Sequence, residues 1–107
     1  MSPIRLVTTH RADEDIATAT AHYVAHAGIE PAVAFIDALE AAMRLLADNS
    51  AIGSTRFAIA TAIPDLRGLA LPSLPFVILY TADADALRIH RVLHTARDLP
   101  QELDDRS

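Results

Sequence analysis

The hydrophobic positions in the first half of the chain recur with the period of an α-helix. The pattern predicts one helix at about residues 10–27 and a second that begins near Pro31. Thr9 is a suitable N-cap for the first helix, and Gly28 is a suitable stop. The second helix has an apolar stripe made by Ala32, Phe35, Ile36, Leu39, Ala42, Met43 and Leu46. A connection of about three or four residues predicts that the two helices pair antiparallel.

Alternating and continuous apolar runs in the remaining segments predict β-strands. Residues 4–8 form a short alternating run before the first helix, and residues 66–71, 74–81 and 87–93 follow a loop at residues 49–63. Short connections between the last three strands indicate an antiparallel meander. The order β-α-α-β-β-β predicts an α+β fold in which a helical hairpin packs on one face of a small antiparallel sheet. Residues 99–105 are either a short C-terminal helix or a tail.

The last strand does not show which of its faces meets the helices. Strict alternation places Leu87, Ile89, Arg91 and Leu93 on one face, and Arg88, His90, Val92 and His94 on the other. Both sets mix apolar and charged residues. Arg91 therefore has two interpretations, a place on an amphipathic contact surface or a buried ion pair with a helix acid.

Composition restricts the classes of protein and site. The chain has 107 residues, 51% of them hydrophobic, which fits one globular domain spanning residues 1–107. It has no cysteine, which excludes disulfides, thiolate metal sites and cysteine nucleophiles. The charge-free run at residues 68–82 is too short to span a bilayer and contains Pro72 and Pro75. We expect a soluble cytoplasmic protein that does not bind membranes.

Charge is unevenly distributed along the chain. The formal net charge of −5 disfavours binding to nucleic acid through broad phosphate attraction. Residues 10–50 carry Arg11 and Arg44 against seven acids. Residues 51–97 are locally positive, with Arg56, Arg67, Arg88, Arg91 and Arg97 against Asp65, Asp83 and Asp85.

Three segments of the C-terminal half resemble the ParE branch of the RelE/ParE toxin superfamily. They are Leu66-Arg67-Gly68-Leu69, the strand that contains Ile78-Leu79-Tyr80, and the closing run RVLHTARD at residues 91–98. The family typically shows an LR-x-L strand, an I-x-Y strand and an RVLH-x-x-RD segment in this order. These proteins are the toxins of type II toxin–antitoxin modules, also called plasmid stabilisation modules. The resemblance covers nearly the whole chain and is weakest over residues 1–30.

The resemblance implies partners and two classes of activity. It implies a cognate antitoxin and a hetero-oligomeric complex with it. ParE-type toxins are known for inhibiting DNA gyrase, whereas RelE-type toxins cut mRNA on the ribosome. An inactive relative kept as an interaction module is a third reading. Since the chain has no basic helix or helix-turn-helix pattern, we expect operator DNA to be bound only by the toxin–antitoxin complex.

The distribution of basic residues favours binding over RNA cleavage. Metal-free cleavage needs cations that activate the 2′-hydroxyl and stabilise charge on the phosphate. The middle strand at residues 74–81 has no basic residue. We therefore predict a binding inhibitor that uses no cofactor. If the protein is a nuclease, the candidate catalytic residues are Arg67, Arg91, His94 and Arg97.

The C-terminal half of the chain also supplies candidate contacts with a partner protein, and several of them have a structural alternative. The candidates are Arg67, Tyr80, Arg91, His94 and Arg97. The alternatives are an ion pair of Arg67 with Asp65 or Asp98, and a core position for Tyr80. His94, Arg97 and Asp98 form either a catalytic group or a structural cluster in which Asp98 caps the following turn and pairs with Arg97 or Arg67. The edge at residues 66–71 is a place where an antitoxin strand could add to the sheet.

The histidines give weak evidence for a metal site. His22 and His26 are one helical turn apart, a spacing that two metal ligands can use. No carboxylate or cysteine pattern accompanies them. We therefore predict no metal.

Overall fold

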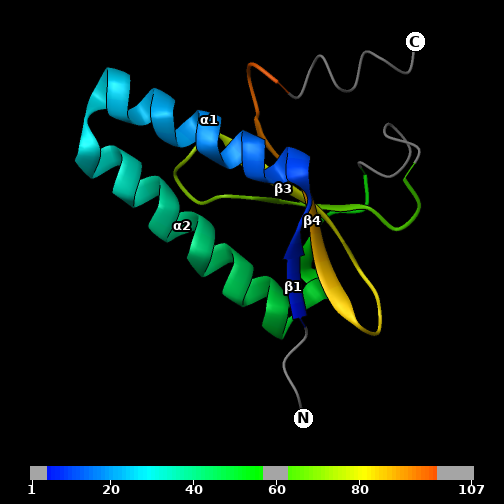
Figure 1. Ribbon diagram of the computed structural model, residues 1–107. Coiled ribbons are helices and arrows are strands. Elements are labelled where there is room, and N and C mark those ends of the chain that lie inside the picture. The colour runs from blue at the N-terminus through cyan, green and yellow to red at the C-terminus, as the bar shows by residue number, and fades with distance from the viewer. Residues whose placement is uncertain (1–4, 57–62, 99–107) are drawn as a thin grey trace.

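The computed structural model describes residues 5–56 and 63–98 and confirms the predicted order of elements. Strand β1 (Arg5–Thr8) leads into helices α1 (His10–Ala27) and α2 (Ile29–Asp48), followed by a short 3₁₀ turn, η1 (Ser50–Ile52). Three strands complete the fold, β2 (Arg67–Ala70), β3 (Phe76–Ala82) and β4 (Ala86–His94) (Figure 1). The prediction for residues 99–105 lies outside the described residues.

The four strands form one mixed sheet in the order β1-β4-β3-β2. The two pairings of β3, with β2 and with β4, are antiparallel as predicted. β1 lies parallel to β4, with Arg5 opposite Ala86 and Thr8 opposite Ile89, so the expectation of a wholly antiparallel sheet is wrong for this strand. Parallel neighbours need a long crossover connection, and the helical hairpin is part of the one that joins β1 to β4.

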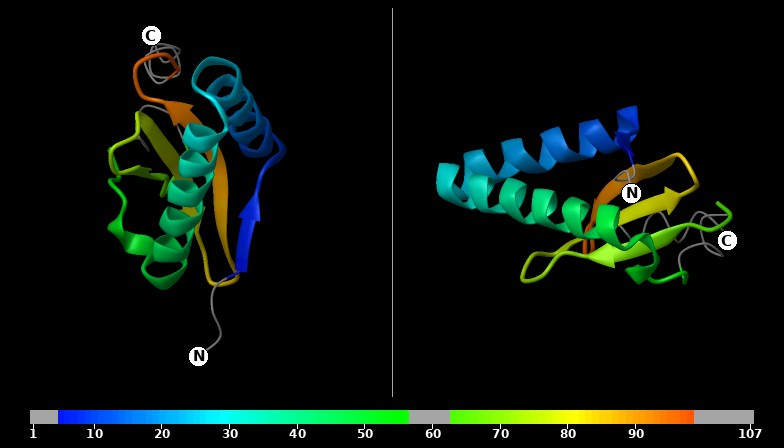
Figure 2. Two further views of the ribbon diagram at one scale, coloured as in Figure 1. Left: turned by 90° about the vertical axis from the view of Figure 1, so that its left-hand side faces the viewer. Right: turned by 90° about the horizontal axis from the view of Figure 1, so that it is seen from below.

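The helical hairpin covers one face of the sheet, with α1 toward β1 and α2 toward β2 (Figure 2). Its connection is Gly28 alone, shorter than the predicted three or four residues. Gly28 has a φ of 100°, a backbone conformation that favours glycine, and its N–H donates to the Tyr23 carbonyl. Within the described residues, no helix is both long and apolar enough to cross a membrane.

The main core lies between the hairpin and the sheet. It includes Phe35, whose ring is 4.9 Å from that of Phe76, and other buried residues of α2, β3 and β4, namely Leu39, Leu46, Ile78, Tyr80, Leu87, Ile89 and Val92. A smaller cluster on the opposite face contains Leu66, Val77, Leu79 and Leu93, with Ile63 packed against it. β3 is therefore apolar on both faces, which explains its continuous hydrophobic run.

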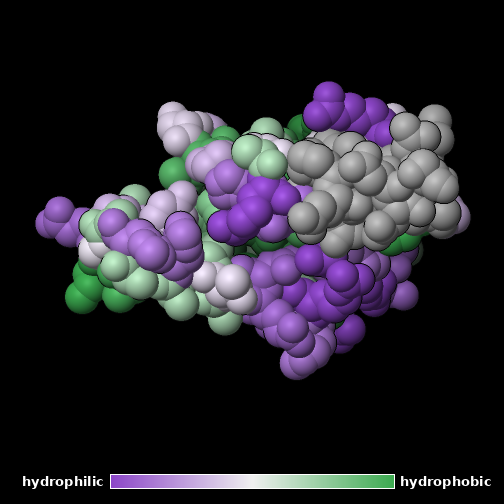
Figure 3. Space-filling view, turned by 90° about the horizontal axis from the view of Figure 1, so that it is seen from above, coloured by the Kyte–Doolittle hydropathy of each residue, from purple (hydrophilic) through white to green (hydrophobic). Residues whose placement is uncertain are grey.

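The far end of the hairpin is also apolar, but it is exposed. Val24, Ile29 and Val33 have exposed fractions of 49%, 69% and 50%. Figure 3 shows hydrophobic side chains at this end of the molecule, beside hydrophilic ones.

A β-bulge at His90 interrupts the alternation of β4. Leu79 lies opposite Arg91 and Tyr80 lies opposite Ile89, so His90 is the extra residue. Before the bulge, Leu87 and Ile89 join the main core; after it, Val92 joins the main core and Leu93 joins the opposite cluster. The predicted division of β4 into two faces was wrong because one inserted residue reverses the side on which every later side chain lies.

The outer edge of β2 is already paired at its centre. The Gly68 N–H donates to the Ser54 carbonyl and the Ser54 N–H donates to the Gly68 carbonyl, both at 2.9 Å. An antitoxin strand that added here, as the sequence suggested, would first have to displace Ser54.

Candidate functional site

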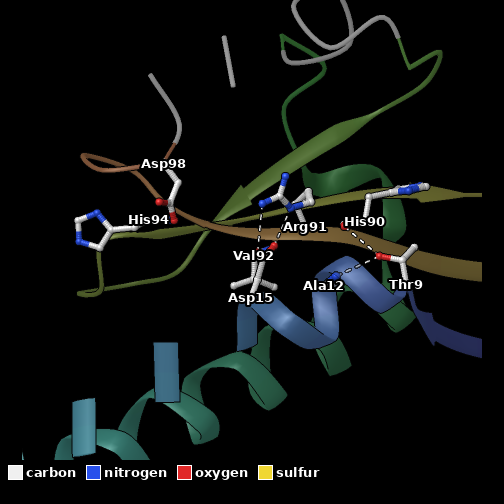
Figure 4. A network of polar contacts seen from close by, with 8 residues as sticks. All are labelled: Thr9, Ala12, Asp15, His90, Arg91, Val92, His94 and Asp98. Atoms are coloured by element: carbon white, nitrogen blue, oxygen red, sulfur yellow. Dashed lines mark hydrogen bonds and ion pairs between the residues drawn. The ribbon is translucent and has the colours of Figure 1, made fainter. Parts of the chain in front are cut away.

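Thr9 joins the start of α1 to the bulge in β4. Its N–H donates to the Ile89 carbonyl at 3.0 Å, which extends the pairing of β1 with β4 by one residue. Its hydroxyl donates to the His90 carbonyl at 3.0 Å and accepts the Ala12 N–H at 3.1 Å (Figure 4). The predicted N-cap is confirmed, and the same side chain also holds the bulge that sets the direction of the residues that follow.

Replacing Thr9 tests this double role. We expect Thr9→Val to lower the free energy of unfolding by about 1–2 kcal/mol, because it keeps the shape but removes both hydroxyl hydrogen bonds. Thr9→Ser keeps the hydroxyl and is expected to remain close to the wild type. Urea unfolding followed by circular dichroism measures both, and equal stability of the two variants would contradict the role of the hydroxyl.

Asp15 of α1 binds the part of β4 that follows the bulge. Its Oδ2 accepts hydrogen bonds from Arg91 Nε at 2.8 Å and from the Val92 N–H at 3.0 Å, and its Oδ1 accepts one from Arg91 Nη2 at 3.1 Å. β1 pairs with β4 only as far as Ile89, so Asp15 supplies an acceptor to the edge beyond it. Both side chains are largely buried, at 18% and 17% exposed. This is the ion pair with a helix acid that the sequence offered for Arg91.

His94, Arg97 and Asp98 form a hydrogen-bonded turn at the end of β4. Asp98 Oδ2 accepts the His94 N–H at 3.0 Å, and Asp98 Oδ1 accepts Arg97 Nε at 3.2 Å. His94 Nδ1 accepts the N–H groups of Ala96 and Arg97, which puts the proton of the neutral ring on Nε2. Asp98 thus pairs with Arg97 and not with Arg67. The turn is tied to the sheet by the Thr95 N–H, which donates to the Pro75 carbonyl.

The charge state of Asp98 is coupled to this turn. Burial by itself would raise the pKa of the Asp98 carboxyl, but the His94 N–H and the Arg97 guanidinium outweigh burial and leave that pKa below its usual range. A lowered pKa means that the ionised carboxyl stabilises the folded chain above the unfolded value, about 3.9, and that this stabilisation is lost as the pH falls through the folded value.

Asp98→Asn measures this contribution. We expect wild type to be more stable than the variant at neutral pH and the difference to shrink as the solution is acidified, because a protonated carboxyl resembles the amide. The urea concentrations at which wild type and Asp98→Asn are half unfolded, measured at several pH values, provide the comparison. A difference that does not change with pH would show that the charge of Asp98 is irrelevant to the turn.

Arg67 and Tyr80 lie on neighbouring strands and hold the 3₁₀ turn. Arg67 Nη1 donates to the carbonyls of Ala51 and Gly53 at 3.2 and 2.9 Å, not to Asp65 or Asp98. The Tyr80 hydroxyl donates to the Ser50 carbonyl at 2.7 Å and accepts the Gly53 N–H at 2.9 Å. Burial raises the pKa of the Tyr80 phenol, and the Gly53 N–H and Arg67 offset part of the rise.

The structure places Tyr80 in the core and not on the surface. Its ring is completely buried, because the alternation of β3 directs Phe76, Ile78 and Tyr80 toward the helices. A ring in this position reaches no partner directly, so the interpretation of Tyr80 as a partner contact is replaced by a structural role.

Three of the four candidate nuclease residues gather at the end of β4, and Arg67 lies apart from them. Arg91 and Arg97 line a hollow of about 220 Å³ between α1 and the end of β4, and His94 and Arg97 line an adjoining one of about 130 Å³. Arg67 lies opposite Tyr80, whereas His94 lies opposite Phe76, four residues along β3. That offset alone is about 13 Å along the strand.

Comparison with known proteins gives the family. The family model described as "ParE toxin of type II toxin-antitoxin system, parDE" matches residues 6–99. The chain belongs to the ParE toxin family. Among solved structures, a chain of the "Chromosomal ParDE TA system from P. aeruginosa" has the same fold, with a TM-score of 0.70 over 85% of this chain and 95% of that chain, at 23% identity. No curated protein matches the sequence significantly.

In this ParE-family chain, the residues that sequence reasoning missed are those whose partners are distant along the chain. Asp15 is one of the seven acids of residues 10–50, and nothing local connects it with Arg91, which lies 76 positions away. Gly53 and Ser54 were assigned to a loop, and no local pattern connects them with Tyr80 or Gly68. The role of Thr9, in contrast, has a local sequence signature, since a threonine between a strand and a helix is a typical N-cap.

The histidine pair of this ParE-family chain lies on α1. The rings of His22 and His26 are 4.4 Å apart and tilted. Among the described residues, no group of three or more side chains is arranged to hold a metal ion.

Proposed function

We propose that this ParE-family toxin is neutralised by a cognate antitoxin and acts by binding its target, not by cutting RNA. One observation carries the proposal: each of the three candidate arginines already binds an acceptor of this chain, although the side chain of Arg97 stays 48% exposed. Arg91 binds Asp15, Arg97 binds Asp98, and Arg67 binds two backbone carbonyls. A guanidinium paired with a carboxylate has its charge largely compensated, so it stabilises a phosphate in the transition state less.

The proposed target is DNA gyrase, as the family implies. We expect the purified toxin to inhibit supercoiling of relaxed plasmid by gyrase, and expect an equimolar amount of antitoxin to restore the reaction. Undiminished supercoiling at high toxin excess would contradict this target.

Two alternatives have distinct outcomes in a cell that lacks the antitoxin. Pulse-labelling after induction would show DNA synthesis falling first if the toxin inhibits gyrase. A first fall in protein synthesis, with cleaved transcripts, would support the ribosome-dependent endonuclease. Uninterrupted growth would support an inactive family member retained as an interaction module. The pulse-labelled cells therefore distinguish all three.

The antitoxin is also expected to be required for binding of operator DNA. α1 and α2 carry only Arg11 and Arg44 as basic residues besides histidine, and the chain has a net charge of −5. We therefore expect a gel-shift of operator DNA with the toxin–antitoxin hetero-oligomer and none with the toxin alone. A cytoplasmic location follows from these proposed partners.

A further inference from the structure

The smaller of the two hollows between α1 and the end of β4 has the size of a single side chain. It encloses about 130 Å³ and is lined by Ala19, His22, Tyr23, Phe76, His94 and Arg97. This volume is well below the roughly 300–1,000 Å³ of a typical small-molecule or cofactor site. The hollow therefore suits one side chain of a partner protein better than a nucleotide or a cofactor.

The polar side chains of this hollow offer hydrogen-bond donors. Nδ1 of His94 accepts two backbone N–H groups, so Nε2 carries the proton of the neutral ring. Arg97 binds Asp98 through Nε, and its terminal nitrogens carry further N–H groups. His22 of α1 is exposed and adds a second imidazole. Of the described residues that line the hollow, none has a carboxylate, so the set is complementary to an anion.

Two aromatic rings give the hollow an apolar side. The rings of Tyr23 and Phe76 are 6.2 Å apart, and the ring of His94 is nearly perpendicular to that of Phe76 at 5.3 Å. Phe76 belongs to the main core and Tyr23 packs against it, so both rings are held in place. Donors beside an apolar side suit an anion on a short aliphatic stem, because the stem packs on the rings while the charged end meets the donors.

The charges around the hollow favour a carboxylate over a phosphate. Glu14, Asp15 and Asp98 line the adjoining hollow, and the chain has a net charge of −5. The charge of Arg97 is partly compensated by Asp98. Like charges repel a phosphate dianion more strongly than the single charge of a carboxylate. The side chains of aspartate and glutamate combine this single charge with an aliphatic stem.

We propose that this hollow binds the carboxylate of an aspartate or glutamate side chain of the target protein, with His94 and Arg97 as the donors. The inference rests on the proposed function, because a toxin that acts by binding needs a contact surface for its target. It adds the position and the chemistry of one contact on that surface.

A double variant removes the donors and keeps the turn. In His94→Asn, Oδ1 takes the place of Nδ1 as acceptor and no donor remains at the position of Nε2, and Arg97→Met keeps the length of the side chain without its N–H groups. We expect His94→Asn/Arg97→Met to require about tenfold or more toxin for half-inhibition of gyrase supercoiling. Arg88→Met is the matched control, because Arg88 forms a comparable exposed pair with Asp83 at the other end of β4, and it should change this concentration less than about twofold. Thermal melting shows whether the variants remain folded.

A titration of the toxin alone tests the hollow without the target. The probe is sodium propionate, which reproduces the side chain of glutamate. Relative to sodium chloride at the same ionic strength, we expect propionate to shift the NMR signals of the lining residues saturably in the wild type and not in the double variant. A stronger response to inorganic phosphate would overturn the choice of a carboxylate. No saturable response to either anion would refute the hollow as an anion site.

The outcomes separate this inference from the proposed function. If the wild-type toxin leaves gyrase active, the proposed target and this contact with it both fail. If the double variant inhibits gyrase as strongly as the wild type, the contact is refuted and the proposed function stands. A double variant that inhibits gyrase fully but binds the antitoxin more weakly in biolayer interferometry assigns the hollow to the antitoxin and also overturns the inference.

Discussion

Asp15→Ala is expected to lower the free energy of unfolding by about 2–4 kcal/mol. The variant removes the carboxylate that two nitrogens of Arg91 bind and the acceptor of the Val92 N–H. All of these groups lie in a partly buried contact between α1 and β4, where water replaces the lost partner poorly. Urea unfolding followed by circular dichroism measures the change.

Two controls separate the contact from the helix on which it lies. Glu14→Ala removes the neighbouring acid, which is exposed and pairs with His10, and it should change stability by less than about 0.5 kcal/mol. Asp15→Asn keeps an acceptor without the charge and should lie between the wild type and Asp15→Ala. A loss in Asp15→Ala no larger than that in Glu14→Ala would show that α1 is not fastened to β4 through this carboxylate.

Tyr80→Phe and Gly53→Ala are expected each to destabilise the fold by about 1–3 kcal/mol, for connected reasons. Tyr80→Phe leaves the buried Gly53 N–H and the Ser50 carbonyl without their hydroxyl partner. Gly53→Ala introduces a Cβ that overlaps the Tyr80 hydroxyl and lies 2.8 Å from Cε1 of the same ring. The ring is held in the core, so it cannot move aside cheaply.

The double variant tests whether the two residues act as one contact. Because Phe has no hydroxyl for the new methyl group to meet, Gly53→Ala/Tyr80→Phe should lose less stability than the sum of the single losses. Chemical denaturation of the four proteins gives the coupling energy. Additive losses would indicate that the 3₁₀ turn moves freely enough to avoid the clash.

The sequence was most informative where a structural signal is local. The period of α2, the capping residue Thr9 and the apolar run of β3 each depend on neighbours within a few residues, and the structure confirms all three. The closing run at residues 91–98 also pointed to the ParE family, which the family match over residues 6–99 shows.

The candidate site was less predictable because residues that look alike in sequence have different partners in the fold. Arg67, Arg91 and Arg97 look alike in sequence as basic residues near strands. In the fold, one binds carbonyls, one binds a helix carboxylate and one binds the adjacent Asp98. Tyr80 was suited to the core or to an interface, and the pleat of β3 places it in the core.

The sequence by itself determined the element order, the helical hairpin and the family, since periodicity, capping and a contiguous motif are all properties of short segments. Tertiary structure alone decided the parallel pairing of β1, the bulge at His90 and the closing of the β2 edge by Ser54. Each of these depends on hydrogen bonds between segments that are distant along the chain, and a change of one residue in register reverses the faces of a strand.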